Sequence, residues 1–235
     1  MSDNIQTRQH KQYYVPYHWF MTVDSFRGRD YYGYVNYVLN LFDYNSKIVL
    51  DAGSGDGKLS SLLAGKGAKV TGIDYSKRAI ALATAIEADT DFVYGSILEC
   101  SFKDKFDFIF LVEVLEHLEP GDVSKALANL KKSLADEGKI IITFPSDNMP
   151  LVDKHFQHFN EDKIKKIAQE ADLKIEKIIN FGFTNKFLNL IYKFLDNRYY
   201  NLKLLSRSFN KKIYPKFLLH KNNDKSERYI IILKK

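Results

Sequence analysis

The sequence predicts an α/β fold, in which a mostly parallel sheet is covered by helices on both faces. Short apolar runs alternate with amphipathic segments from Lys47 onward, as in strands that are joined by crossover helices. The run Phe106–Val112 is continuously apolar, which is typical of a strand buried on both faces. Ligands bind such sheets at the carboxyl ends of the strands, where the strand order reverses, so we expect the functional site there.

The elements of the first hundred residues follow from apolar spacing and one cap. Residues 31–41 have helical spacing within an aromatic segment, and short apolar runs indicate the strands. Ser76 is a favourable N-cap for the helix that follows it. The expected elements are a helix at 31–41, a strand at 47–50, a helix from 58 to 64, a strand at 69–73, a helix at 76–86 and a strand at 92–94.

The second half of the chain continues the same alternation. Gly138 is expected to end a helix, and Pro145 to close the strand after it. Asn160 is expected to cap a helix that has Glu161 and Asp162 in its first turn, where the helix dipole favours them. The expected elements are a strand at 106–112, a helix at 123–134, a strand at 139–144, a helix at 160–171 and strands at 173–179 and 229–233.

Composition places the chain among globular proteins of a reducing compartment. It has 235 residues, of which 45% are hydrophobic and 27% charged, enough for one domain with a sizeable core. The single cysteine, Cys100, can form no internal disulfide. No run approaches about 18 apolar residues, and the polar N-terminus has no apolar signal segment. We therefore expect a cytoplasmic protein without a transmembrane segment.

Charge and aromatic content divide the chain into three regions. We expect an N-terminal aromatic helical lid at 1–45, the main α/β domain at 46–182 plus 226–235, and a basic amphipathic helical insertion at 183–225. Residues 183–235 hold ten Lys, three Arg and three acidic residues, a net charge of +10, which leaves −4 for the rest. Either the insertion is a lid that packs its apolar face, Phe183 to Leu195, over the site, or it contacts an anionic surface peripherally.

A glycine-rich loop and two carboxylates form the candidate ligand site. Gly53, Gly55 and Gly57 directly follow a strand and precede a helix, where glycine lets the backbone approach a ligand closely. Asp74 ends the next strand, at the position where an acid accepts hydrogen bonds from ribose hydroxyls. Asp51, just before the loop, would repel a pyrophosphate but suits a cationic ligand. The tight GSGDG spacing also differs from the dinucleotide pattern G-x-G-x-x-G.

Five segments in order resemble the motifs of class I S-adenosylmethionine-dependent methyltransferases. They are VLDAGSGDGKLS, VTGIDYS, YGSILE, FDFIFLVEVLEHL and GKIIITFPS, and the resemblance runs from about Lys47 to Gly182. It implies a Rossmann-like seven-stranded sheet whose last strand is antiparallel, and S-adenosyl-L-methionine as cofactor. By this resemblance, the cofactor contacts are Asp51, Gly53, Ser54, Gly55 and Gly57 for the methionine portion, Asp74 for the ribose, Tyr75 for the adenosine, and Ser96 and Ile97 for the adenine.

Methyl transfer needs an aligned acceptor and, for an alcohol, a base that takes its proton. Candidate bases follow the fourth and fifth strands, and we expect the catalytic residues to be His155, Glu113 and His117. Glu116 and His158 are close in sequence. A purely structural role is the competing interpretation, in which Glu116 and His117 brace a helix start and His158 packs before the cap.

The segments EVLEHL and HFQH also resemble a metal site. Their Glu-Glu-His and distant His match the pattern of methyltransferases that modify the 3′-terminal ribose of small RNAs. The same EVLEHL occurs in many metal-free relatives, and PSDN followed by KHFQHF resembles sugar- and glycan-modifying members. We therefore expect no metal.

Three functions remain open from the sequence. The leading one is O-methylation of a small-molecule or glycan acceptor such as a sugar precursor, with phosphorylated or lipid-linked forms included. The second is metal-dependent 2′-O-methylation of the RNA 3′-terminal ribose, which makes nucleic acid the less favoured partner. The third is a non-catalytic cofactor-binding interaction domain, against which the intact Asp51, Gly53, Gly55 and Asp74 argue.

Overall fold

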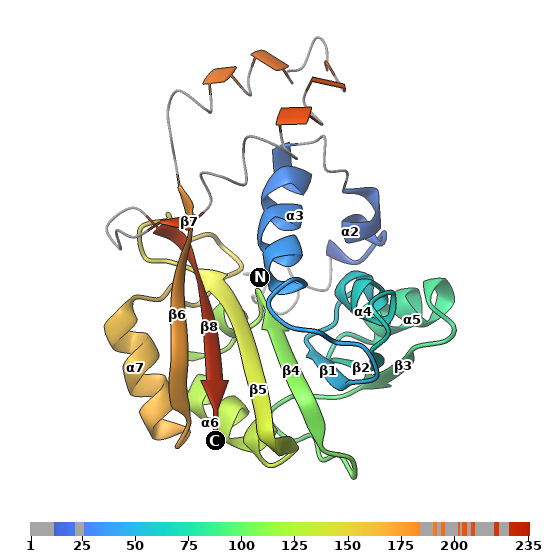
Figure 1. Ribbon diagram of the computed structural model, residues 1–235, viewed down its shortest axis with the longest axis vertical. Coiled ribbons are helices and arrows are strands. Elements are labelled where there is room, and N and C mark those ends of the chain that lie inside the picture. Colours follow the sequence, from blue (N-terminus) through green and yellow to red (C-terminus); the bar gives the residue numbers. More distant parts are fainter. Residues whose placement is uncertain are drawn as a thin grey trace, which may run out of the picture.

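The computed structural model describes residues 12–21, 26–183, 190–191, 194–195, 202, 204–205, 208–209, 219–220 and 226–235. Its helices are α2 (Tyr17–Phe20), α3 (Phe26–Val38), α4 (Lys58–Ala64), α5 (Lys77–Ile86), the short 3₁₀ helix η1 (Leu115–His117), α6 (Pro120–Lys131) and α7 (Glu161–Glu170) (Figure 1). Its strands are β1 (Ile48–Ala52), β2 (Lys69–Asp74), β3 (Asp91–Tyr94), β4 (Phe106–Val112), β5 (Leu134–Pro145), β6 (Lys174–Phe183), β7 (Leu219–His220) and β8 (Ser226–Lys234).

The strands form one mixed sheet in the order β3-β2-β1-β4-β5-β8-β6-β7. Neighbours from β3 to β5 pair in parallel, whereas β8 lies antiparallel between β5 and β6. The predicted seven strands and the antiparallel last strand are therefore confirmed. The two-residue β7 adds an edge strand beyond β6. The order reverses between β1 and β4, which places the expected ligand crevice at the carboxyl ends of these two strands.

Alternation along β4 explains why helices cover both faces of the sheet. Phe108 and Phe110 belong to one core cluster with residues of α3 and α4. Ile109 and Leu111 face the opposite way, into a second cluster with residues of α6 and α7. In Figure 1, α2 and α3 lie at the end of the sheet toward which the parallel strands run, opposite the arrowhead of β8. The N-terminal helices thus stand beside the ligand crevice.

Two predicted helix caps are confirmed. Ser76 accepts a hydrogen bond from the Ala79 backbone N–H through its hydroxyl at 3.3 Å. Asn160 accepts one from the Lys163 backbone N–H through its side-chain oxygen at 3.0 Å. Each cap satisfies one of the N–H groups that have no partner within a first turn.

The predicted boundaries at Gly138 and at the start of α3 were wrong. Gly138 does not end a helix: α6 stops at Lys131, and both Leu134 and Gly138 lie in β5. Here the Phe106 backbone N–H donates to the Ser133 carbonyl, so pairing with β4 extends the strand backward. A Cβ at Gly138 would lie 2.9 Å from the Phe106 carbonyl oxygen, so glycine serves this close approach. Helix α3 also begins at Phe26, five residues before the predicted start.

Most of the predicted insertion lies outside the described residues. Within it, Leu195 and Phe209 are buried in the cluster that contains α3. Leu190 and Phe194 are 65% and 64% exposed, so the predicted apolar face is only partly buried. Among the described residues, no helix combines the length and apolar character that crossing a bilayer requires.

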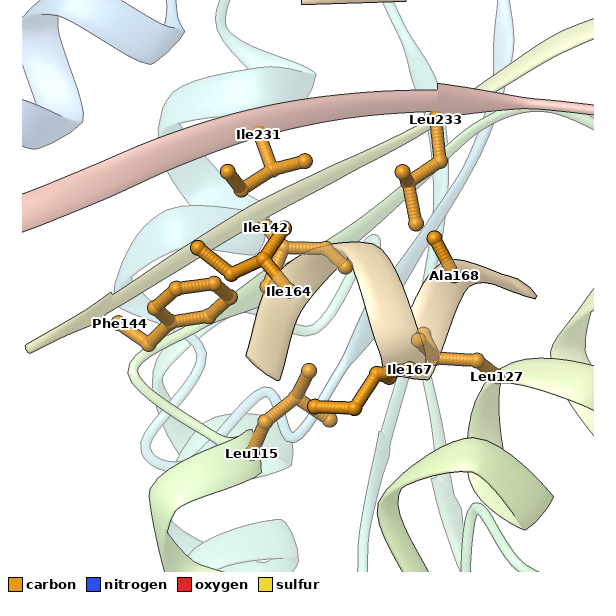
Figure 2. Close-up of a pocket in the computed structure, with 9 residues that line it drawn as sticks. All are labelled: Leu115, Leu127, Ile142, Phe144, Ile164, Ile167, Ala168, Ile231 and Leu233. Atoms are coloured by element: carbon orange, nitrogen blue, oxygen red, sulfur yellow. The ribbon is translucent and has the colours of Figure 1, made fainter. Parts of the chain in front are cut away.

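A small cavity lies inside the core rather than at the crevice. Figure 2 shows it between β5, β8 and α7, with only apolar side chains around it. Its volume is about 10 Å³, no more than about one water molecule requires. This cavity is a packing gap and cannot hold a cofactor. Its lining residues are Leu115, Leu127, Ile142, Phe144, Ile164, Ile167, Ala168, Ile231 and Leu233.

Candidate active site

The loop after β1 needs glycine at three positions. Gly53, Gly55 and Gly57 have φ values of 86°, 55° and 78°, in the left-handed region that other residues rarely adopt. A Cβ at Gly53 would lie 2.5 Å from Val114, which follows β4 across the crevice. A Cβ at Gly55 would lie 2.6 Å from the Tyr13 hydroxyl. The predicted cofactor loop is therefore a tight cradle between β4 and the N-terminal segment.

Asp51 and Ser54 provide polar groups that suit a cationic ligand. Asp51 is 2% exposed and accepts a hydrogen bond from the Ser60 hydroxyl at 2.6 Å. Burial raises the pKa of Asp51 to about 7, although the Ser60 hydrogen bond opposes this shift. The Ser54 hydroxyl is buried and has no partner among the described residues. A bound ammonium would compensate the burial of the Asp51 carboxylate, so these residues fit the methionine portion of S-adenosylmethionine.

Asp74 is held at the end of β2 by backbone donors. One carboxylate oxygen accepts from the Gly55 N–H at 3.0 Å, and the other from the Ser76 N–H at 2.8 Å. These bonds tie the carboxylate to the glycine loop, as the predicted ribose contact requires. Tyr75 beside it is half-buried, and burial together with the Asp74 charge raises the pKa of its phenol.

The predicted adenine contacts lie one strand further along. The Gly95 N–H donates to the Asp74 carbonyl, which brings the end of β3 beside Asp74. Ser96 accepts the Leu98 N–H through its hydroxyl at 3.2 Å and so starts a turn. Ile97 is buried in the core cluster with α6. Both residues follow β3 at the carboxyl end of the parallel strands, and their adenine contacts stay a prediction.

Glu113 sits in a strained backbone conformation at the end of β4. Its φ is 56°, unusual for a residue with a side chain and typical of functional sites. One carboxylate oxygen accepts from the Thr143 hydroxyl at 3.0 Å, and the other from the Arg228 Nε at 3.1 Å. Both oxygens of Glu113 therefore hold structural partners, and a catalytic role for this residue stays a prediction.

The adjacent residues Glu116 and His117 lie close to His155, although about forty residues separate this pair from His155 in the sequence. One side-chain ligand atom from each lies within 4.8 Å of the others. The rings of His117 and His155 are 4.8 Å apart and perpendicular. Glu116 is 1% exposed, and its Oε1 lies 3.9 Å from His117 Nε2, whereas neither carboxylate oxygen has a hydrogen-bond partner among the described residues. Three groups that could hold a proton or a divalent cation therefore meet beyond the carboxyl end of β4.

Burial controls the charge of this cluster. It raises the pKa of Glu116 well above its ordinary value, and the nearby Glu113 adds to the shift. It lowers the pKa of His117 to about 4 and that of His155 to about 3. Both imidazoles are therefore neutral at pH 7 and present a lone pair.

The N-terminal segment is fastened onto the glycine loop through Asp56. This fully buried carboxylate accepts from the His18 backbone N–H and pairs with His18 Nδ1, both at 2.9 Å. The Asp56 carbonyl accepts from Trp19 Nε1 at 2.8 Å, and the Lys58 ammonium stacks on the Trp19 ring. Residues 12–20 thus lie against the glycine loop, and their action as a lid stays a prediction.

Tyrosines from the N-terminal segment and from α3 form a buried wall near the carboxylates of the predicted site. Tyr13, Tyr31 and Tyr34 are all buried, and His18 stacks on Tyr31 at 5.0 Å. Burial raises the pKa of each phenol, and the nearby carboxylates add to the shift. The wall therefore consists of neutral aromatic rings.

Sequence reasoning missed three supporting partners. Asp56, which contacts His18 and Trp19, stands between Gly55 and Gly57. A carboxylate between two loop glycines was the sequence feature that could have indicated its role. Thr143 in β5 and Arg228 in β8 hydrogen-bond to Glu113. Both are distant from Glu113 in the sequence, so no local pattern could predict these contacts.

Comparisons with known proteins identify the family of this chain. A family model described as a methyltransferase domain matches residues 24–178. A ubiquinone biosynthesis O-methyltransferase of Alkalilimnicola ehrlichii is 30% identical over 174 residues, which cover 63% of this chain and 68% of that protein. An uncharacterized methyltransferase of Staphylococcus carnosus is 34% identical over 94 residues, 40% of this chain and 45% of that protein. The chain thus spans less than half of the latter relative.

Solved structures share the fold. A SAM-dependent methyltransferase of Archaeoglobus fulgidus has a TM-score of 0.65 at 20% identity, covering 92% of this chain and 99% of that one. The magnesium protoporphyrin IX methyltransferase of Synechocystis with bound SAH has a TM-score of 0.59 at 18% identity, covering 90% and 88%. The family match and the glycine cradle together identify S-adenosylmethionine as the cofactor. The chain belongs to the methyltransferase domain family and is a class I S-adenosylmethionine-dependent methyltransferase with a Rossmann-like fold.

Proposed function

We propose that this enzyme O-methylates a hydroxyl group of a small organic acceptor. The observation that carries the proposal is the neutral pair His117 and His155, gathered with Glu116 beyond the end of β4 and across the crevice from the cofactor loop. A hydroxyl acceptor must lose a proton, and a neutral imidazole is the usual group that takes it. The O-methyltransferase names of several curated relatives support the same reaction type.

The residues divide the work between holding and proton transfer. When bound, the cofactor supplies a methyl group activated by its sulfonium. Asp51 would pair with its ammonium, and Asp74 would accept from its ribose. Glu113, held by Thr143 and Arg228, fixes the positions of the side chains around it at the end of β4. His155 takes the acceptor proton. The tyrosine wall excludes water and packs on the acceptor ring.

Two acceptor classes fit this arrangement. The sequence resemblance favours a sugar or glycan precursor. The low basicity of the buried His155 favours a more acidic hydroxyl, such as a phenol with a pKa of about 10. The relatives named for ubiquinone biosynthesis support the hydroxylated aromatic class.

A second candidate function uses the same cluster as a metal site. Glu116, His117 and His155 have side-chain types that bind divalent cations, which favours metal-dependent methylation of an RNA 3′-terminal ribose. We expect no metal requirement, because the segment EVLEHL also occurs in many metal-free methyltransferases.

One experiment tests these alternatives together. Methyl-labelled S-adenosylmethionine is supplied with separate pools of hydroxylated aromatics, nucleotide sugars, lipid-linked glycans and small RNAs, each with and without exhaustive chelation. We expect chelator-resistant label on an oxygen of a small molecule. Label on RNA that disappears on chelation and returns with magnesium or manganese would support the second function. Label on nitrogen or carbon would contradict O-methylation.

A further inference from the structure

A short hydrogen-bond chain lies behind His155. His155 Nδ1 is 2.8 Å from His158 Nε2, and His158 Nδ1 is 3.1 Å from the Met149 carbonyl oxygen. His158 is 6% exposed, so water does not substitute for these contacts. The chain begins at a residue of the proposed site and ends at the backbone.

Counting protons along this chain fixes the tautomers. A carbonyl only accepts, so His158 Nδ1 carries a proton. A neutral His158 then has a lone pair at Nε2, and His155 Nδ1 must carry the proton between the two rings. His155 consequently has its lone pair at Nε2.

The reverse assignment is costly. If His158 Nε2 donated to His155, both nitrogens of His158 would carry protons and the ring would be a cation. A cation at this buried position lacks a described carboxylate within hydrogen-bond distance of the ring. The neutral arrangement therefore dominates.

The loop that carries His158 is fixed at several points. The Asp147 N–H donates to the Phe159 carbonyl, and the Phe156 N–H donates to the Glu116 carbonyl. Phe159, next to His158, is fully buried. The His158 ring therefore has a defined orientation, which a proton acceptor for His155 requires.

We propose that His158 is a positioning residue. Its Nε2 accepts a hydrogen bond from His155 Nδ1–H and so keeps the Nε2 lone pair of His155 available to the acceptor hydroxyl. The proposal rests on the proposed O-methylation. As the acceptor oxygen bonds to the methyl carbon, the sulfonium–carbon bond breaks and the hydroxyl proton passes to His155 Nε2. The resulting His155 imidazolium keeps its Nδ1–H bond to His158, which stabilises the new charge, and later releases the proton to solvent.

His117 provides an internal comparison. Its Nδ1 donates to the Lys154 carbonyl at 2.8 Å, so its tautomer depends on the backbone and not on His158. A substitution at His158 should therefore change the tautomer of His155 and leave that of His117 unchanged.

The test combines His158→Leu with His158→Gln. Leucine removes the acceptor, whereas the glutamine amide can accept from His155 and donate to Met149. Nitrogen-15 NMR of the chelator-treated protein at pH 7 reads the tautomer of each histidine, and thermal melts confirm folding. We expect wild type and His158→Gln to show an unprotonated His155 Nε2, and His158→Leu to show a mixture.

Kinetics with a turned-over hydroxyl acceptor complete the test. We expect His158→Leu to lower kcat by about tenfold or more, while KM and the SAH Kd stay within about twofold of the wild-type values. His158→Gln should retain most of the wild-type kcat. A protonated His155 Nε2 in the wild type, or an unchanged kcat in a folded His158→Leu protein, would overturn the proposal. If no hydroxyl acceptor is methylated, the proposed function fails, and the NMR result decides the tautomer assignment by itself.

Discussion

The N-terminal segment, which we propose to act as a lid, is attached to Asp56 through His18, and the free energy of this attachment follows from its contacts. Asp56→Asn keeps the shape but replaces one carboxylate oxygen, which accepts from His18, by an NH₂ group. A hydrogen bond to a charged group contributes about 1.5–3 kcal/mol. The His18 side chain is 19% exposed, so solvent screening puts the loss near the lower end. About 1.5 kcal/mol corresponds to roughly a tenfold shift toward the open lid.

The assay follows from the composition of the lid. Trp19 is the only tryptophan of the chain, and its Nε1 donates to the Asp56 carbonyl, so its fluorescence reports the attachment. We expect stopped-flow release of SAH to be about tenfold faster in Asp56→Asn, with a shifted Trp19 emission. Asp104→Asn, at an exposed carboxylate, is the matched control and should behave as wild type. An unchanged release rate and emission in Asp56→Asn would refute a lid held closed through Asp56.

Two further predictions concern stability. Burial raises the pKa of Asp51 to about 7, so the native state keeps a proton that the unfolded chain loses above about pH 4. Stability of the free protein should therefore fall as the pH rises from about 4 to 7, and melts of Asp51→Asn at pH 5 and 7 should show a smaller difference. Leu195→Ala should cost about 2–5 kcal/mol of unfolding free energy, whereas Phe194→Ala, at an exposed neighbour, should stay within about 0.5 kcal/mol. Equal melting temperatures of these two variants would contradict the packing of Leu195 in the core. Strong binding of the wild-type protein to anionic vesicles at physiological salt would favour the alternative, in which the insertion is a surface anchor.

The sheet could be predicted because its strands are short apolar runs that are recognisable from neighbouring residues alone. Apolar runs such as Phe106–Val112 and caps such as Ser76 and Asn160 depend on neighbouring residues, and all appear as expected. The end of α6 depends instead on a long-range pairing of β5 with β4, so Gly138 was assigned to the wrong element. The edge strand β7 has two residues, too short for any periodic signal.

The candidate site likewise has a part that local sequence patterns could predict and a part that depends on long-range contacts. The glycine loop follows β1 and Asp74 ends β2. Because these two consecutive strands pair in parallel, their carboxyl ends lie side by side, and the sequence could predict that the loop and Asp74 meet. The approach of His155 to Glu116 and His117 depends on the path of the loop after β5, which no sequence pattern specifies. The same holds for Arg228, which reaches Glu113 from a strand 115 residues later.

Calorimetric titration with SAH tests the central claim most directly. Asp74 connects the end of β2 to the glycine loop and is expected to accept from the ribose hydroxyls. Wild type should bind SAH in the micromolar range, and Asp74→Ala should bind it more weakly by about 1–3 kcal/mol, the cost of leaving such donors unpaired. Equal affinity of the two proteins, or no binding by the wild type, would contradict a cofactor site at the ends of β1 and β2.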